Sequence, residues 1–189
     1  MSTRASDAAM RQEPAGATSS AGGQGQAARD VAVFAAGCFW GVQFYFDQVP
    51  GVIETEVGYI GGHTEQPSYE AVCAHKTGHA EATRIVFDPK KISYEKLLAQ
   101  FFRMHDPTQM NRQGPDVGDQ YRSAIFYKDE AQKQAAQKAI DELNSSGKFK
   151  KPIVTSLEPA DKFWPAENYH QKFTERTGRG MCHVDYAPV

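Results

Sequence analysis

The hydrophobic and polar positions along the chain predict a domain in which strands and helices follow one another. Apolar or alternating runs with the period of a strand occur at 31–36, 52–59, 80–87, 121–127 and 153–157. Patterns with the period of a helix occur at 39–49, 69–73, 129–145, 166–174 and directly after Ser93. Strands separated by helices, with some strands joined directly, predict an α+β fold: a mixed sheet with helices packed on it, as a two-layer ferredoxin-like sandwich with extended loops.

The first 28 residues lack these patterns. Residues 1–28 contain no Ile, Leu, Val, Phe, Tyr or Trp and are rich in Ala, Gly, Ser and Gln, so they cannot build a core. They also lack the apolar stretch of a secretory signal. We therefore predict a disordered tail at 1–28 and a single folded domain at 29–189 with a mobile C-terminal segment.

Composition and charge narrow the functional classes. The chain has 189 residues, of which 40% are hydrophobic, and a formal net charge of −2. This balance gives no sign of nucleic-acid binding, and the apolar runs are too short to cross a bilayer. The three cysteines are too few and too widely spaced for a disulfide framework, and in the cytosol such thiols are catalytic or inert more often than structural. We expect a cytoplasmic monomer that binds neither membranes nor nucleic acids.

The segment around Cys38 is the strongest candidate for chemistry. This thiol lies between the predicted strand 31–36 and the predicted helix that follows, where unpaired N–H groups and the helix dipole favour a thiolate. The glycines on either side allow a sharp turn and the close approach of another group. Phe39 and Trp40 add an apolar wall beside the sulfur. The alternative is that Cys38 is a small buried hydrophobic residue of the core.

Glu81 is the candidate acid. In the predicted strand, residues 81, 83, 85 and 87 point to one face, so Glu81 shares a face with Ile85 and Phe87. If that face is the core, burial raises the pKa of the carboxyl group, and a protonated acid near a thiolate is a general acid. The alternative is a solvated glutamate at a strand end, or one paired with Arg84 or Lys76.

The loop that follows the third predicted helix is dense in polar groups. An irregular loop of this length, 105–122, is often functional in a compact domain. Asp116 and Tyr121 could aim a carboxylate and a phenol at one point, whereas Asp106 starts a turn that could simply satisfy its own backbone. Tyr69, outside the loop, could donate to a substrate oxygen or pack at a rim.

The other two cysteines permit two readings each. Cys182 lies in a glycine-containing stretch near the C-terminus, where a mobile thiol could form a disulfide with a reactive one or could be a stray thiol. Cys73 is expected to be buried and inert. Together with His75 and His79 it suggests zinc, but the spacing fits no standard site, and we expect no metal.

Six short motifs occur in order along the chain. They are Gly-Cys-Phe-Trp-Gly at 37–41, Gly-His-Ala-Glu at 78–81, His-Asp-Pro-Thr at 105–108, Asn-Arg-Gln-Gly at 111–114, Asp-Val-Gly at 116–118 and Gln-Tyr-Arg-Ser at 120–123. Together they resemble peptide methionine sulfoxide reductase of the A type, over roughly residues 31–182. One departure is Pro115, where members of that family often carry Asn.

The resemblance implies roles for five residues. Cys38 is similar to the nucleophile that attacks the sulfoxide sulfur, and Glu81 to the acid that protonates the departing oxygen. Tyr69 and Tyr121 match tyrosines that hydrogen-bond this oxygen. Asp116 matches a carboxylate that organises the site and its water. The implied reaction reduces methionine-S-sulfoxide, free and in proteins, to methionine without a cofactor.

The resemblance also implies a substrate pocket and a reductant. Phe39 and Trp40 match the wall that holds the substrate methyl group. Cys182 matches a resolving cysteine that forms a disulfide with Cys38, which thioredoxin would then reduce. The competing hypotheses are a thiol peroxidase, a thiol-based redox sensor and a metal-binding module.

Overall fold

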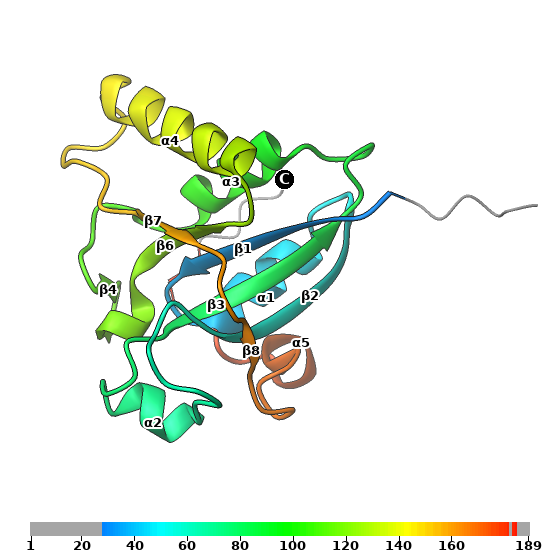
Figure 1. The fold of residues 1–189 in the computed structure, drawn as a ribbon, viewed down its shortest axis with the longest axis vertical. Coiled ribbons are helices and arrows are strands. Elements are labelled where there is room, and N and C mark those ends of the chain that lie inside the picture. Colours follow the sequence, from blue (N-terminus) through cyan, green and yellow to red (C-terminus); the bar gives the residue numbers. More distant parts are fainter. Residues whose placement is uncertain (1–27, 182, 185–189) are drawn as a thin grey trace, which may run out of the picture.

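A mixed sheet forms the centre of the protein in a computed structural model that describes residues 28–181 and 183–184 (Figure 1). The strand order is β7-β6-β1-β3-β2-β8, and only the β6–β7 pair is parallel. The strands are β1 Asp30–Ala36, β2 Val52–Ile60, β3 Ala80–Phe87, β6 Ser123–Tyr127, β7 Ser156–Pro159 and β8 Trp164–Pro165. The predicted tail, apart from its last residue, lies outside the described residues, as does Cys182.

Five α-helices and a small hairpin complete the described fold. The helices are α1 Phe39–Asp47, α2 Tyr69–Cys73, α3 Tyr94–Met104, α4 Glu130–Ser145 and α5 Phe173–Thr177. The hairpin pairs β4 Arg112–Gln113 with β5 Asp116–Val117, and a 3-10 turn, η1 Asp119–Tyr121, leads into β6. Ser93 begins α3 by accepting a hydrogen bond from the Lys96 N–H, and this satisfies a backbone donor of the first turn.

The helices α1, α3 and α4 cover one face of the sheet. The strand residues Phe34, Ile85 and Ile125 point to this face and belong to one buried cluster with apolar residues of all three helices. On the other face a smaller cluster, which includes Phe126, packs against Phe163 in the segment before β8. The predicted α+β fold, a mixed sheet with helices packed on it, is confirmed.

Three predictions in the second half of the chain are wrong. The strand predicted at 153–157 begins only at Ser156, because 153–155 turn toward other partners: the Val154 N–H donates to the Pro107 carbonyl at 2.8 Å. The helix predicted at 166–174 is replaced by turns, and α5 starts at Phe173. Tyr121, predicted to begin a strand, lies in η1.

Tertiary hydrogen bonds explain why 166–172 is not helical. The Ala166 N–H donates to the Val57 carbonyl, extending the contact that β8 makes with β2. The Gln171 side chain then pairs with both the N–H and the carbonyl of Val57, at 3.0 and 2.9 Å. These bonds satisfy the exposed edge of β2, so the segment follows that edge instead of coiling into a helix.

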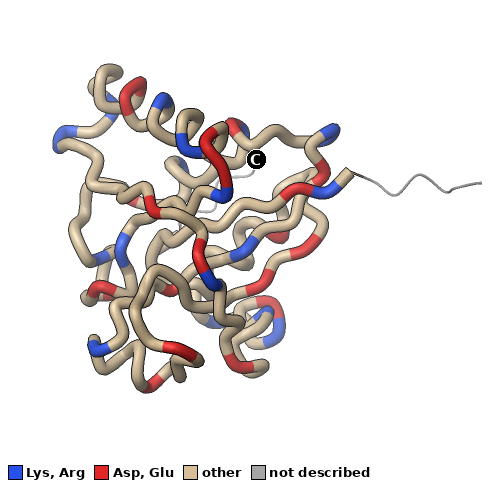
Figure 2. Tube along the Cα trace, viewed as in Figure 1, with Lys and Arg blue, Asp and Glu red and all other residues tan. Residues whose placement is uncertain are grey.

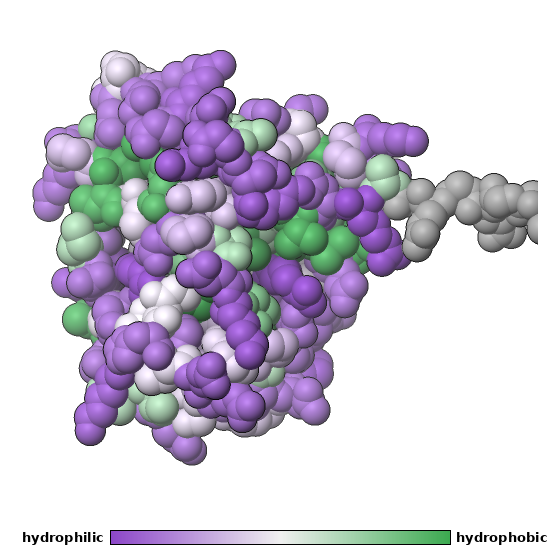
Figure 3. All heavy atoms as spheres, in the orientation of Figure 1, coloured by the Kyte–Doolittle hydropathy of each residue, from purple (hydrophilic) through white to green (hydrophobic). Residues whose placement is uncertain are grey.

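Charges of both signs are interspersed along the chain trace (Figure 2). The face seen in Figure 3 is largely hydrophilic, with small hydrophobic areas between the polar ones. Among the residues that the structure describes, none of the helices has the length and apolar character needed to span a membrane.

Candidate functional site

Cys38 lies at a sharp turn between β1 and α1. Gly37 has φ of +93°, a conformation that residues with a side chain rarely adopt, and it turns the chain out of the sheet. Cys38 is the N-cap residue of α1 and is 7% exposed, so the sulfur lies at the positive end of the helix dipole, as predicted. This location favours a thiolate over a thiol.

The side chain of Glu81 reaches the same turn. Glu81 is 1% exposed, and its Oε2 accepts a hydrogen bond from the Phe39 N–H at 3.1 Å. It therefore caps the first turn of α1, one residue after Cys38. The prediction that Glu81 faces the core is confirmed, and Arg84, one of the two surface partners considered for it, pairs with Glu56.

Two phenols lie near this carboxyl group. Burial raises the pKa of Tyr69 and of Tyr121, and both phenols lie close enough to the Glu81 carboxyl group to interact with it electrostatically. Both phenols therefore stay protonated and can donate hydrogen bonds. Tyr121 also lies close enough to Cys38 and Asp116 for their charges to raise the pKa of its phenol. The structure thus brings together five residues that the sequence predicts to act in the reaction: Cys38, Tyr69, Glu81, Asp116 and Tyr121.

The aromatic residues after Cys38 are held by a histidine that the sequence reasoning missed. His170 is fully buried, and its Nδ1 accepts a hydrogen bond from Trp40 Nε1 at 2.9 Å. The indole also stacks on Phe173, with ring centroids 3.9 Å apart. Phe39 packs against both His170 and Tyr59. Trp40 is therefore fixed on two sides, while Phe39 is 1% exposed and part of the core.

Glu167 lies beside this histidine, with its Oε2 3.8 Å from His170 Nε2. It accepts hydrogen bonds from the Tyr59 hydroxyl and from the Tyr69 N–H, both at 2.8 Å. Burial alone would raise the pKa of Glu167, but these bonds hold it below its ordinary value, so the carboxylate stays charged. Burial lowers the pKa of His170, which stays neutral and carries its hydrogen on Nε2. The signal in the sequence was a histidine that directly follows Tyr169 and precedes Phe173 by three residues.

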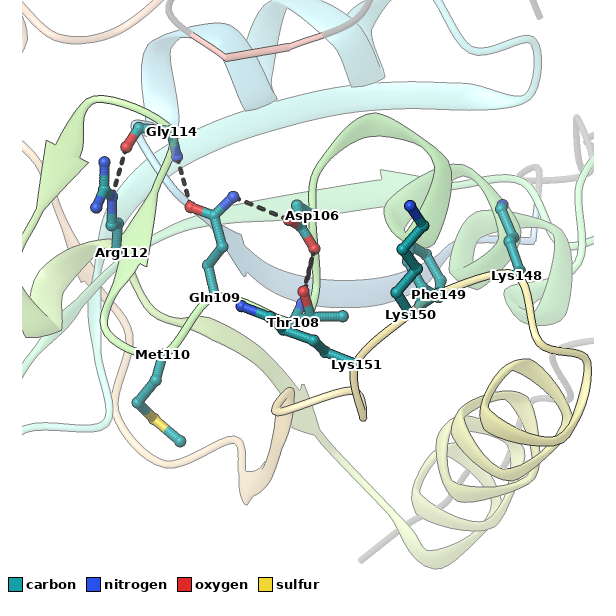
Figure 4. Close-up of a pocket in the computed structure, with 10 residues that line it drawn as sticks. All are labelled: Asp106, Thr108, Gln109, Met110, Arg112, Gly114, Lys148, Phe149, Lys150 and Lys151. Atoms are coloured by element: carbon teal, nitrogen blue, oxygen red, sulfur yellow. Dashed lines mark hydrogen bonds between the residues drawn. The ribbon is translucent and has the colours of Figure 1, made fainter.

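The loop after α3 is organised around Asp106. Its Oδ1 accepts from the N–H and the hydroxyl of Thr108, and its Oδ2 accepts from Gln109 Nε2 at 2.9 Å. Gln109 also accepts from the Gly114 N–H (Figure 4). The polar groups of these residues therefore find their hydrogen-bond partners within the turn. This is the alternative to a functional role that the sequence left open for this part of the loop.

A hollow of about 690 Å³ lies beside this network (Figure 4). The basic residues that line it are Arg112, Lys148, Lys150 and Lys151. None of the catalytic candidates that the structure describes lines it, so it is separate from the Cys38 site.

The second half of the loop brings Asp116 toward the C-terminal segment. Asp116 Oδ2 lies 4.0 Å from Nδ1 of His183, and His183 Nε2 lies 2.6 Å from the Ala36 carbonyl. Cys182, the predicted resolving cysteine, lies outside the described residues. Its neighbour His183, which the sequence reasoning did not use, therefore shows where this part of the chain meets the site.

The residues considered for zinc point to other partners. His75 pairs with Asp119 at 3.0 Å, and His79 contacts the Gly62 N–H and the Thr64 carbonyl. Burial raises the pKa of the Cys73 thiol, which is only partly buried and not fully enclosed as expected. Within the described part of the chain, no group of three or more potential ligands could hold a metal ion.

Comparisons with known proteins agree on one family. The family model described as peptide methionine sulfoxide reductase matches residues 30–189. The peptide methionine sulfoxide reductase MsrA of Methanosarcina acetivorans is 58% identical over 147 residues, 78% of each chain. That of Geobacter metallireducens is 49% identical over 152 residues, 80% of this chain and 94% of the relative.

Solved structures give the same result for the fold. Reduced Mxr1 from Saccharomyces cerevisiae superimposes with a TM-score of 0.76 at 33% identity and covers 85% of this chain and 89% of its own. Methionine sulfoxide reductase A of Corynebacterium diphtheriae has a TM-score of 0.71 at 32% identity, with 87% and 80% covered.

Proposed function

Because the chain belongs to the peptide methionine sulfoxide reductase family, we propose that it reduces methionine-S-sulfoxide to methionine, both free and in oxidised proteins. The observation that carries this proposal is the contact between the buried Glu81 carboxyl group and the Phe39 N–H. This contact supports a role for Glu81 as the proton donor next to Cys38.

The chemistry requires both groups at once. A thiolate at Cys38 attacks the sulfoxide sulfur, but the sulfoxide oxygen is a poor leaving group until it is protonated. Glu81 supplies that proton, and the phenols of Tyr69 and Tyr121 donate hydrogen bonds to the same oxygen. Asp116 helps to organise this side of the site. Methionine is released, and the Cys38 sulfur becomes a sulfenic acid.

The apolar side of the site selects the substrate. Trp40, held by His170 and Phe173, presents a fixed aromatic face to the methyl group of the sulfoxide. Phe39 supports this face from within the core. A thiol peroxidase needs no such wall, and a redox sensor needs no paired acid, so the arrangement favours the reductase over both alternatives.

Turnover requires that the sulfenic acid be removed. Cys182 condenses with it to a disulfide, and thioredoxin reduces this disulfide by thiol–disulfide exchange. A dithiol reductant is available in the cytoplasm, where we place the reaction. The biological role is the repair of methionine residues damaged by oxidation.

An assay on separated epimers tests the proposal. The enzyme is incubated with dithiothreitol and a peptide that contains either the S or the R epimer of methionine sulfoxide. We expect turnover of the S epimer alone, loss of turnover in Cys38→Ser and near wild-type turnover in the control Cys73→Ser. Turnover of the R epimer alone, or of neither, contradicts the proposal.

A further inference from the structure

His183 lies between the end of β1 and the loop that carries Asp116. Its side chain is 4% exposed, and Nε2 lies 2.6 Å from the carbonyl of Ala36, the last residue of β1. Since a carbonyl only accepts, Nε2 must carry the hydrogen and donate it. On the other side of the ring, Nδ1 lies 4.0 Å from Asp116 Oδ2, and both of these atoms are buried without a hydrogen-bond partner among the described residues.

Three glycines make room for this histidine and its neighbour. A Cβ atom on Gly37 would lie 2.4 Å from His183 Cε1, and one on Gly114 would lie 3.2 Å from His183 Cβ. A Cβ atom on Gly41 would lie 2.9 Å from a methyl carbon of Val184. Gly37 and Gly41 are the glycines of the Cys38 motif, where the sequence predicts the close approach of another group. In the structure that group is the C-terminal segment.

The chain is held on both sides of position 182. Val184 is 8% exposed and belongs to the main core cluster, and its N–H donates to the Met181 carbonyl at 3.1 Å. On the preceding side, the Met181 carbonyl lies against Gly41, the third residue of α1. The segment therefore crosses the start of α1, and His183 supplies its one side-chain hydrogen bond to the strand end before Cys38 among the bonds described.

We propose that His183 is a positioning residue for the resolving step. Its hydrogen bond holds the C-terminal segment against Ala36, so that the thiol of Cys182 meets the oxidised Cys38. This inference rests on the proposed function. In the step, the Cys182 sulfur attacks the sulfur of the Cys38 sulfenic acid. An S–S bond forms, the S–O bond breaks, and the oxygen leaves as water with the thiol proton. Cys182 is oxidised and the sulfenic sulfur is reduced.

A C-terminal segment held in place accelerates this step, because it removes the cost of bringing the Cys182 thiol to the Cys38 sulfenic acid from a mobile chain. The sulfoxide step does not need the segment, since Cys38 and Glu81 are held by β1, α1 and β3. Loss of the His183 bond should therefore slow one step and spare the other. A role for His183 in general stability would not separate the two steps in this way.

The test compares two rates in single-turnover experiments without external reductant. Methionine release from the S epimer reports the sulfoxide step, and the loss of sulfenic acid trappable by dimedone reports disulfide formation. The variants are His183→Ala, His183→Gln, which keeps an N–H donor at the same reach, and the matched control His63→Ala, whose imidazole is exposed.

We expect His183→Ala to release one methionine per enzyme at the wild-type rate and to form the disulfide about ten-fold more slowly. This factor corresponds to the loss of one hydrogen bond between the C-terminal segment and the end of β1. His183→Gln should recover most of that rate, and His63→Ala should match wild type in both steps. Equal disulfide rates in His183→Ala and wild type would overturn the inference, and so would a lost methionine burst in His183→Ala. Failure of the wild type to release methionine would instead refute the proposed function.

Discussion

Replacement of Glu81 by glutamine separates the two roles of this side chain. Glutamine has the same shape, and its amide oxygen can still accept from the Phe39 N–H, which Glu81 Oε2 does at 3.1 Å. We therefore expect a loss of stability below about 1 kcal/mol. The amide cannot transfer a proton, and a general acid contributes about 10²–10⁴-fold to a rate. Because the amide N–H₂ still donates a hydrogen bond, we expect the lower end, a reduction of about 10²-fold.

Alanine at the same position tests the structural role. Glu81→Ala leaves a buried N–H without its acceptor and opens a cavity, which together cost about 2–4 kcal/mol. Single-turnover methionine release measured by quenched flow gives the chemical rate, and urea unfolding gives the stability. An unchanged rate in Glu81→Gln would exclude Glu81 as the acid. An unchanged unfolding free energy in Glu81→Ala would show that the bond to Phe39 contributes nothing to the fold.

Three further predictions address the fold and the pocket. Thr83→Val should raise the free energy of unfolding by about 1 kcal/mol, because the Thr83 hydroxyl is fully buried with no hydrogen-bond partner in the described chain; a decrease in urea denaturation would contradict this. Burial lowers the pKa of His105 to about 4 in the fold, against 6.5 when unfolded, so the unfolded chain binds the extra proton between these values and stability falls as the pH drops through this range. The loss from pH 7.5 to 5 is about 2 kcal/mol, and it should shrink in His105→Gln; an equal loss in that variant would refute the assignment. Trp40→Phe keeps the stacking but removes the bond to His170, and should raise KM for the S epimer about ten-fold; an unchanged KM would show that the indole position does not matter.

The sequence was sufficient where local pattern decides the structure. The alternation through β3 correctly placed Glu81 on the core face, because neighbouring side chains of a strand must point to opposite faces. The start of α3 followed from Ser93 in the same way, since the cap is a local contact. The turn at Cys38 followed from the change between strand and helix period.

The sequence was insufficient where distant segments meet. The bond from the Phe39 N–H to Glu81 joins residues 42 positions apart, and the bond from Trp40 to His170 joins residues 130 apart. No periodic pattern encodes such pairs. The segment 166–172 had a helical pattern, but its side chains bond to β2 and α2 instead, so tertiary contacts overrode the local preference.

The identity of the oxidised residue tests the central claim most directly. Cys182→Ser is mixed with a peptide containing the S epimer, without reductant, and treated with dimedone, and the modified cysteine is located by mass spectrometry. The account predicts one methionine released per enzyme and one adduct, on Cys38. An adduct on Cys73, or methionine release without any adduct on Cys38, would contradict it.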